Sequence, residues 1–587
     1  MKHEVIQALI SATRTSLVIL TIWLINLQLN TGATAPAIAS ALILTMVQTN
    51  GSSLAKATGR MIGTIIGGLF VVAISGIGLV DAYVFNTILI SFITLTAVYS
   101  YKYRDNTYLS YGYALCGLTA SFAGFPVTLN PDVTFAFDKS VARVIGIFLS
   151  ILITELGFLL MPTTNEKDAL NSTINDYHRS LNNLLFNFID MPCENVVQKV
   201  LTQVFPLANR VKIMLVDVRF SQFIDRQDSI TVRPTYALMN AIISMIKLTV
   251  YARSWDNIAL FRPSIKQAIH RIIERESNTF AELQNIQFAQ DSRSQSIRFE
   301  LFKLLKSVER YYHGSQKEQR DCPSLKAPNK GMLALTIVGL RTFVVLNLIS
   351  VFWIESQWSS GFSAMMLTAA MLPIFAFIPF NGAIKSFSIA MPLCIVVGFI
   401  VNYVLMPVFP TELLFAAMLI YIFACTYAFF TSNAKYRLTF LFLGVFWAIP
   451  TSMDNTASFD FSSFVNNSMG YLIAVLILNL AFYLIPEPTT NSSLARVVRN
   501  YLSGKISTNA ACNIVEYYSQ YTSVLNYDED LYHHFLSSLR MAEKKQLKED
   551  VIGEDNQIQP DGHLSYDPLL PVDYSRKWFI MESDLKK

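Results

Sequence analysis

The sequence predicts an all-α membrane protein with two parallel six-helix transmembrane repeats, a helical cytoplasmic insert between them and a helical cytoplasmic C-terminal region. Composition gives the first reason: hydrophobic residues make up 52% of the chain and charged residues only 15%, against about 25% charged in ordinary soluble domains. An internal duplication gives the second reason, and the distribution of basic residues among the loops gives the third.

The apolar residues gather in two regions, and a more polar block follows each of them. We therefore divide the chain into a first transmembrane half, a cytoplasmic helical domain, a second transmembrane half and a cytoplasmic C-terminal helical region. Their bounds are 1–162, 163–331, 332–486 and 487–587. Apolar residues at helical spacing predict the helices of both polar blocks. Beyond Lys548 a polar and acidic composition predicts a partly disordered end.

The duplication is clearest at the end of each half. Segment 135–162 aligns without gaps on segment 459–486, so that Phe137 matches Phe461 and Gly146 matches Gly470. Shorter matches recur in the same order elsewhere, at Arg14-Thr15 and Arg341-Thr342, Asn50-Gly51 and Asn381-Gly382, and Lys102-Tyr103-Arg104 and Lys435-Tyr436-Arg437. An ordered series of matches indicates a duplicated membrane unit.

Each half contains six apolar segments that can span a membrane. A helix needs about 20 apolar residues to cross the hydrocarbon, and fewer where neighbouring helices shelter its ends. The first half has spans at 16–29, 33–47, 61–80, 85–99, 109–125 and 141–161. The second half has spans at 333–354, 362–378, 387–408, 413–430, 438–449 and 469–485. We interpret the first as a spanning helix and not as a cleaved signal peptide, because the next span follows almost at once.

Loop charges orient these spans, because Lys and Arg collect on the cytoplasmic side of short loops. An N-terminus in the cytoplasm places most basic loop residues inside and mainly Asp and Glu outside. The basic residues are Lys56, Arg60, Lys102, Arg104, Lys385, Lys435 and Arg437. Both termini are then expected in the cytoplasm, and an even number of spans per half makes the repeat parallel.

Motifs for several other functions are absent from the sequence. No GxxxxGK[ST] phosphate loop, HExxH or GxSxG motif occurs, so we expect neither an enzyme nor a cofactor. The six cysteines form no CxxC pair, and no metal site is expected. The formal net charge of +4 includes no basic run, which argues against nucleic acid as a partner.

Glu155 is a carboxylate within the apolar run 151–160. An ionised carboxylate inside a membrane helix costs about 2.5–3.5 kcal/mol on insertion scales. Three roles stay open: proton coupling, a structural hydrogen bond or ion pair, and a position near the membrane interface. Its counterpart in the repeat is Asn479, so the repeat itself does not require a carboxylate.

Arg14, Arg143 and Arg341 lie at or just inside the ends of spans, where a long side chain can reach the headgroups. Guanidinium groups that face a shared midline would instead suit a carboxylate substrate, so the three are candidate substrate-binding residues. Tryptophans near span ends are expected to be mainly interface anchors. They are Trp23, Trp353, Trp358 and Trp447.

The third span opens with the segment GRMIGTIIGG, residues 59–68. Small residues three or four positions apart let helix backbones approach closely in lipid. Helix packing is the first interpretation of this motif, and lining of a substrate path is the alternative.

These residues resemble the fusaric acid resistance and aromatic acid exporter family, often called FUSC. That family typically opens its third span with R-x-x-G-T-x-x-G, and its second half carries a W-x-x-G-like turn. The matching residues here are Arg60, Gly63, Thr64 and Gly67 for the first motif, and Trp358 and Gly361 for the second. The RT pair near the start of each half and the large insert agree with the family's layout.

The resemblance implies a proton-driven exporter of aromatic carboxylic acids or similar toxic compounds, embedded in the lipid of the cell inner membrane and linked to drug resistance. It also implies that the transporter sometimes works with a periplasmic adaptor (membrane fusion) protein, while a homo-oligomer stays open. The residues alone leave two alternatives: a gated organic-anion channel, and a membrane scaffold with a partner-binding cytoplasmic domain.

Overall fold

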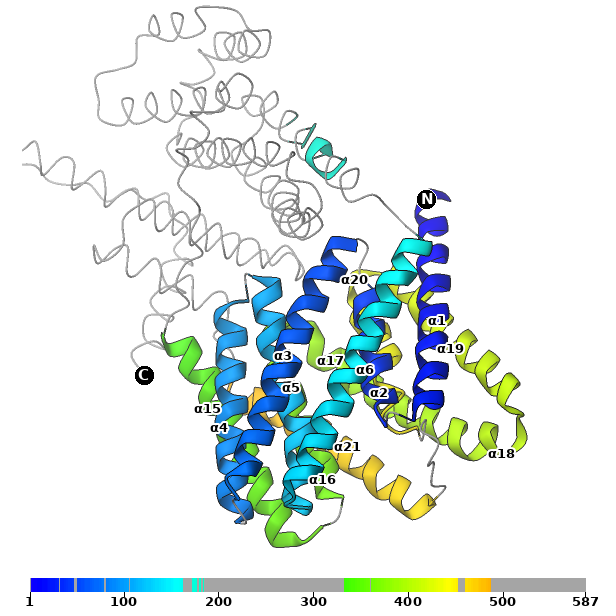
Figure 1. The fold of residues 1–587 in the computed structure, drawn as a ribbon. Coiled ribbons are helices and arrows are strands. Elements are labelled where there is room, and N and C mark those ends of the chain that lie inside the picture. The colour runs from blue at the N-terminus through cyan, green and yellow to red at the C-terminus, as the bar shows by residue number, and fades with distance from the viewer. Residues whose placement is uncertain are drawn as a thin grey trace, which may run out of the picture.

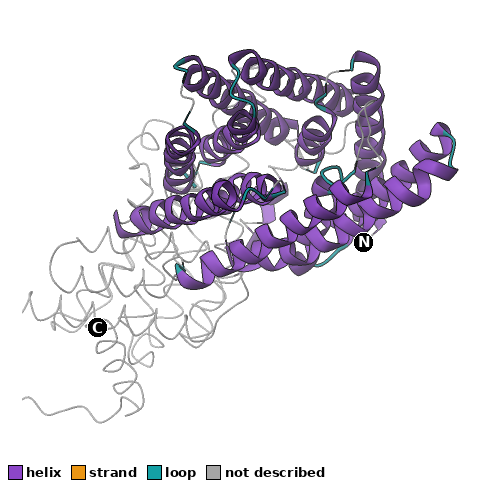
Figure 2. Cartoon of the chain, turned by 90° about the horizontal axis from the view of Figure 1, so that it is seen from below, coloured by secondary structure: helices purple, strands orange, loops and turns teal. Residues whose placement is uncertain are grey.

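The computed structural model describes residues 2–161 and 332–486, apart from short gaps at 31, 47–49, 79–80, 105, 359, 379 and 452–459, and a few residues between 172 and 183. These residues form helices and contain no strand (Figure 2). Except for those few residues, the expected cytoplasmic regions 163–331 and 487–587 lie outside the described residues.

Every expected span overlaps a helix. The first half consists of α1 (Lys2–Leu29), α2 (Thr34–Thr45), α3 (Asn50–Gly76), α4 (Ala82–Lys102), α5 (Thr107–Leu129) and α6 (Val133–Leu160). The second half consists of α15 (Met332–Ser356), α16 (Gly361–Phe377), α17 (Phe380–Phe399), η3 (Ile400–Leu405), α18 (Met406–Val408), α19 (Thr411–Thr431), α20 (Ala434–Phe446) and α21 (Phe461–Leu484).

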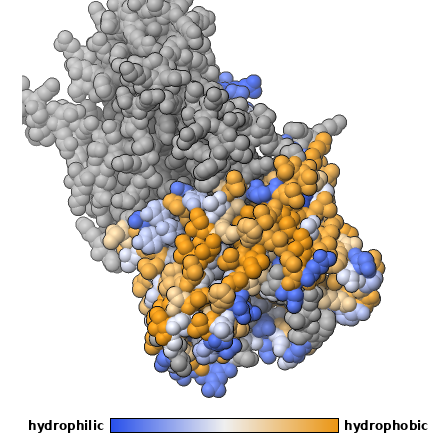
Figure 3. All heavy atoms as spheres, viewed as in Figure 1, coloured by the Kyte–Doolittle hydropathy of each residue, from blue (hydrophilic) through white to orange (hydrophobic). Residues whose placement is uncertain are grey.

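Nine helices of the described residues are long and apolar enough to cross a membrane. This agrees with the prediction of an all-α, multi-pass membrane protein. Helices α2, α16 and the 436–446 part of α20 are shorter. At 1.5 Å per residue the 12 residues of α2 cover about 18 Å, less than the hydrocarbon thickness. Apolar side chains dominate much of the surface in Figure 3, as expected for a protein in membrane lipid.

Several helices extend beyond the predicted spans. Helix α3 begins at Asn50 and not at 61, and α6 begins at Val133 and not at 141. Hydropathy marks the residues suited to hydrocarbon, whereas backbone hydrogen bonds continue a helix through polar residues. The span expected at 387–408 contains the π-helical turn η3, where Asn402 donates to the Pro450 carbonyl oxygen at 3.0 Å.

The two halves meet through helices with corresponding places in the chain. Helix α1 packs against α19, and α15 packs against α4; likewise α2 contacts α20, and α16 contacts α5 (Figure 1). In the first contact the rings of Trp23 and Phe415 lie 4.4 Å apart. In the second, Asn86 Nδ2 donates to Ser350 Oγ at 2.9 Å.

Three of the tryptophans expected at the membrane interface are buried. Trp23 is 3% exposed, Trp353 is 5% exposed and Trp447 is fully buried. The interface prediction is therefore wrong for these three, because they pack between helices: the Trp447 ring lies 6.4 Å from Trp23 and 5.7 Å from Tyr421. Nearness to a span end does not tell which face of a helix a side chain occupies.

An aspartate caps the sixth helix of each half. Asp132 Oδ1 accepts a hydrogen bond from the Thr134 backbone N–H at 3.1 Å. Asp460 Oδ1 accepts one from the Ser462 backbone N–H at 3.0 Å. The Thr134 hydroxyl lowers the pKa of Asp132, and the Ser463 hydroxyl lowers the pKa of Asp460. Because the folded-state pKa is depressed, this stabilisation is present above the ordinary carboxyl pKa of 3.8. It is lost as the pH falls through the lowered value.

We expect Asp132→Ala to lower the melting temperature of the purified protein at pH 7, because the N-terminus of α6 loses its cap. The difference from the unsubstituted protein should shrink as the pH falls below the lowered pKa. Asp138→Ala, an exposed position inside the same helix, is the matched control and should have little effect. Thermal unfolding between pH 7 and pH 3 checks this, and equal losses for both variants would contradict the capping role.

Candidate functional site

Arg14, in α1, is 1% exposed and reaches the end of α6. Its Nη1 donates to the Met161 carbonyl oxygen at 3.3 Å, and its guanidinium carbon lies 3.7 Å from the centre of the Phe158 ring. Met161 is the C-cap of α6. Carbonyl groups at a helix C-terminus lack partners inside the helix and carry partial negative charge, so a guanidinium stabilises them.

Arg341, in α15, makes the same two contacts in the second half. Its Nη1 donates to the carbonyl oxygen of Ile485, the C-cap of α21, at 3.3 Å. Its guanidinium carbon lies 3.6 Å from the centre of the Phe482 ring. The structure does not bring Arg14 and Arg341 to a shared midline, because α1 and α15 lie on opposite sides of the helical region (Figure 1).

Glu155 is half-buried in α6 and accepts a hydrogen bond from Ser53 Oγ of α3 at 2.9 Å. Its charge also interacts with that of Arg14. In the second half Asn479 takes its place, and its Nδ2 donates to Ser388 Oγ of α17 at 2.8 Å. Both halves thus join their third and sixth helices through a polar contact, and the first half uses an ionisable group for it.

The glycine motif of α3 lies against α5. A Cβ at Gly63 would overlap the Gly112 carbonyl oxygen, and a Cβ at Gly67 would lie 2.5 Å from the carbonyl oxygen of Cys116. These two backbones therefore approach more closely than larger residues would allow. Gly59 and Gly63 also line a cavity beside α4. The same glycines therefore pack against α5 and line a cavity.

Two further arginines are buried in the first half. Arg60 is 2% exposed, and its Nη1 donates to Tyr111 Oη at 2.6 Å. Arg143 is 8% exposed, and its guanidinium carbon lies 4.7 Å from the centre of the Phe122 ring. Within the described part of the chain, the Nε atoms of both arginines and the buried hydroxyl of Thr64 have no hydrogen-bond partner.

Trp358 lies in the turn between α15 and α16, and Gly361 is the first residue of α16. A Cβ at Gly361 would lie 2.6 Å from Trp353 Cδ1 and 3.2 Å from Trp358 Cε3. Gln357, in the same turn, has a φ of 51°, in the left-handed region. The W-x-x-G residues therefore build a tight turn in which glycine makes room for two indole rings.

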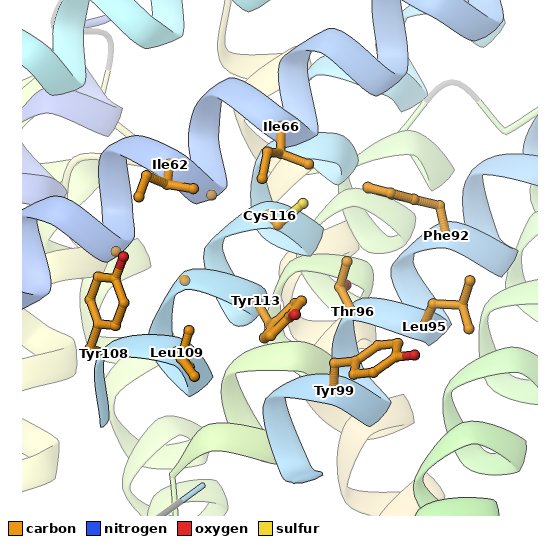
Figure 4. Close-up of a pocket in the computed structure, with 13 residues that line it drawn as sticks. Ile62, Ile66, Phe92, Leu95, Thr96, Tyr99, Tyr108, Leu109, Tyr113 and Cys116 are labelled. Atoms are coloured by element: carbon orange, nitrogen blue, oxygen red, sulfur yellow. The ribbon is translucent and has the colours of Figure 1, made fainter. Parts of the chain in front are cut away.

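A cavity of about 330 Å³ opens between α3, α4 and α5 (Figure 4). This volume lies within the range of small-molecule sites, about 300–1,000 Å³. The lining is mainly apolar, with four aromatic side chains. They are Phe92, Tyr99, Tyr108 and Tyr113.

Stacked tyrosines form one edge of this cavity. The Tyr113 ring lies 5.3 Å from Tyr99 and 5.8 Å from Tyr103, and the planes differ by 23° and 13°. Lys102 Nζ lies 5.6 Å from the centre of the Tyr99 ring and 5.5 Å from that of Tyr103. Aromatic faces next to a cation suit a ligand that combines an aromatic ring with a negative charge.

Sequence reasoning missed this cavity. The available signal was the segment YSYKYRDNTYLSYGY, residues 99–113, which is rich in tyrosine. Its residues belong to the end of α4 and the start of α5, and only the packing of these two helices stacks the rings.

Comparisons with known proteins find a matching family model and relatives named as transporters. A family model described as the fusaric acid resistance protein family matches residues 20–190 and 231–521. The uncharacterized transporter YdhK of Salmonella typhimurium is 23% identical over 474 residues, which cover 74% of this chain and 67% of that protein. YdhK of Escherichia coli strain K12 is 22% identical over 470 residues, with the same coverage. No solved structure matches the chain.

We expect Gly63→Ala to destabilise the protein by about 1–3 kcal/mol, because the added methyl group would overlap a backbone oxygen of α5. Gly76→Ala, at the end of the same helix, is the matched control, since a Cβ there would meet no atom within 4 Å. Thermal unfolding of the purified variants measures the difference, and equal melting temperatures would contradict a close contact between α3 and α5.

We expect Arg341→Met to destabilise the protein by about 2–4 kcal/mol, because it removes both a charge-assisted hydrogen bond and a cation–π contact. Arg437→Met is the control, since the exposed Arg437 also donates to a backbone carbonyl, that of Ser432, at 3.2 Å. Thermal or denaturant unfolding should show a clear loss for the first variant and little for the second. A loss of the same size in both would contradict the special role of the buried arginine.

Proposed function

Because the chain belongs to the fusaric acid resistance protein family, we propose that it is a proton-driven efflux transporter of aromatic carboxylic acids or related toxic organic compounds across the cell inner membrane. The coarser conclusion, a multi-pass membrane protein related to transporters, follows from its helices and its relatives. The observation that carries the finer proposal is the tyrosine-edged cavity between α3, α4 and α5.

This cavity has the chemistry for an aromatic acid. A substrate ring can stack against Tyr113 and Tyr99, and its carboxylate can pair with the Lys102 ammonium group. Tyr99 is 40% exposed and Ile66, on the opposite wall, is 50% exposed, so the cavity opens at the surface of the helical region. An amphiphilic aromatic acid can therefore enter it from the surrounding lipid or from the headgroup region.

The contacts between the halves support a transporter made of two parallel six-helix repeats. The first helix of each half packs against the fourth helix of the other, and the second packs against the fifth. A twofold relation along the membrane normal accounts for these paired contacts. Relative motion of the two halves would then expose the substrate path to each side in turn. In this arrangement both termini are cytoplasmic.

Glu155 is our candidate for proton coupling. In its charged form Glu155 accepts a hydrogen bond from the Ser53 hydroxyl and interacts with the charge of Arg14. Proton binding would remove that charge and weaken the attraction to Arg14, which also supports the end of α6. One proton could thus alter the contacts among α1, α3 and α6.

We assign the sequence-predicted arginines different roles. Arg14 and Arg341 support the ends of the sixth helices, because each donates to a C-cap carbonyl of its own half. Arg143 stays a candidate for binding the substrate, since it is buried and its Nε atom has no hydrogen-bond partner among the described residues.

The first experiment is export of radiolabelled 4-hydroxybenzoate from cells that overexpress the chain, with and without a protonophore. We expect export that collapses with the proton gradient. Glu155→Gln should reduce it to about the background while the protein still folds, because the group that binds the proton is gone. Glu412→Gln, an exposed carboxyl at the start of α19, is the matched control and should leave export intact.

The same assay tests the cavity. Tyr113→Leu removes one ring of the tyrosine cluster that lines the cavity and should raise the substrate concentration needed for half-maximal export, whereas Tyr427→Leu, in α19, should not. Flux that neither the protonophore nor Glu155→Gln changes would support a gated anion channel instead. Absence of flux for a panel of aromatic acids would contradict the proposed function and favour a scaffold or another substrate.

A further inference from the structure

We propose that Arg60 and Arg143 together bind one carboxylate group inside the first half, at a site between α3, α5 and α6. Neither arginine lines the tyrosine-edged cavity. A role of this site in export rests on the proposed function. Binding of the carboxylate, however, can be measured without transport.

Two contacts fix how α3 and α6 lie against each other. Ser53 of α3 meets Glu155 of α6, and Gly68 of α3 accepts a hydrogen bond from Ser140 Oγ at 3.5 Å. As residue numbers rise along α3 they fall along α6, so the two helices are antiparallel. The same register places Arg143 opposite residues 64 and 65 of α3.

The face of α3 that turns toward α6 carries Arg60, Thr64 and Gly68, spaced four residues apart on one side of the helix. Arg143 follows Ser140 by three residues on the facing side of α6. Arg143 therefore lies level with Thr64, one helical turn from Arg60. The charges of the two arginines are close enough to act on each other.

The polar groups at this place lack the partners that buried charges normally have. Within the described residues neither arginine forms an ion pair. Arg60 donates to Tyr111 and Arg143 lies on the face of Phe122, but the Nε atoms of both remain without acceptors, as does the Thr64 hydroxyl. Two like charges in an apolar interior repel each other, and an anion between them stabilises both.

A carboxylate fits this arrangement better than a bare ion. Its two oxygen atoms can accept from one guanidinium each, and the Thr64 hydroxyl adds a further donor. The ring of Phe122, on which Arg143 lies, supplies an aromatic surface for the rest of the ligand. The site therefore suits a monocarboxylate attached to a ring or another apolar body.

The second half does not repeat this site. Arg143 corresponds to Asn467 in the aligned segments, and Arg60 corresponds to Met391 when the match of Asn50 with Asn381 is extended without a gap. Asn467 is neutral and its Oδ1 accepts the Ser363 hydroxyl at 2.9 Å. The duplication thus predicts one buried carboxylate site per chain.

Benzoate is the probe, and benzamide is its neutral counterpart. With the purified full chain in detergent, calorimetry should show a benzoate site that depends on Arg143, and benzoate but not benzamide should raise the melting temperature. Arg143→Gln should weaken benzoate binding by about tenfold or more, because a charge-assisted hydrogen bond is lost. Its melting temperature without benzoate should stay the same or rise, since an uncompensated buried charge has been removed.

Arg104→Gln is the matched control, because Arg104 donates to the backbone carbonyls of Phe377 and Ile378. It should lower the melting temperature and leave benzoate affinity unchanged. Arg143→Lys keeps the charge but not the planar guanidinium group. This variant should fold normally and bind benzoate more weakly. Unchanged benzoate affinity in either Arg143 variant, or equal binding of benzamide, would overturn the site.

The two proposals fail separately. Benzoate binding that depends on Arg143, together with absence of export, would contradict the transport function and leave the site standing. Export of aromatic acids without binding that depends on Arg143 would overturn the site alone.

Discussion

In a membrane the end of a helix has no water to satisfy its last carbonyl groups, and each half of this protein meets that constraint with one arginine. Arg14 and Arg341 each lie on a phenylalanine ring and donate to the C-cap of the sixth helix. In the first half this contact joins the end of α6 to α1. Helix α6 also carries Glu155 and Arg143, and its packing against α3 and α2 places these ionisable groups inside the first half.

Helix α3 separates two chemically different regions. Its glycines lie against α5 so closely that the two backbones nearly touch, and beside α4 this leaves an apolar cavity edged by tyrosines. The adjacent side of α3, with Arg60 and Thr64, turns toward α6 and holds buried positive charge. Helix α3 therefore has an apolar, tyrosine-edged cavity on one side and buried positive charge on another.

The two halves share their architecture but differ in their polar groups. The helix-end arginine occurs in both, as does the polar contact between the third and sixth helices. Glu155 and Arg143, however, correspond to the neutral residues Asn479 and Asn467. This difference between the halves supports our proposal that the two charges of the first half serve binding and coupling, because the second half packs its sixth helix without them.

Sequence alone determined the helical membrane character, the approximate places of the helices and the resemblance to a family, because hydropathy, repeats and short motifs are local properties of the chain. It also singled out Arg14, Arg341 and Glu155. Only the tertiary structure decided what each contacts: the helix-end role of Arg14 and Arg341, the burial of Trp447, and the stacking of the tyrosines of α4 and α5. The physical reason is that periodicity shows that a face is apolar, whereas the partner of that face depends on how distant helices pack.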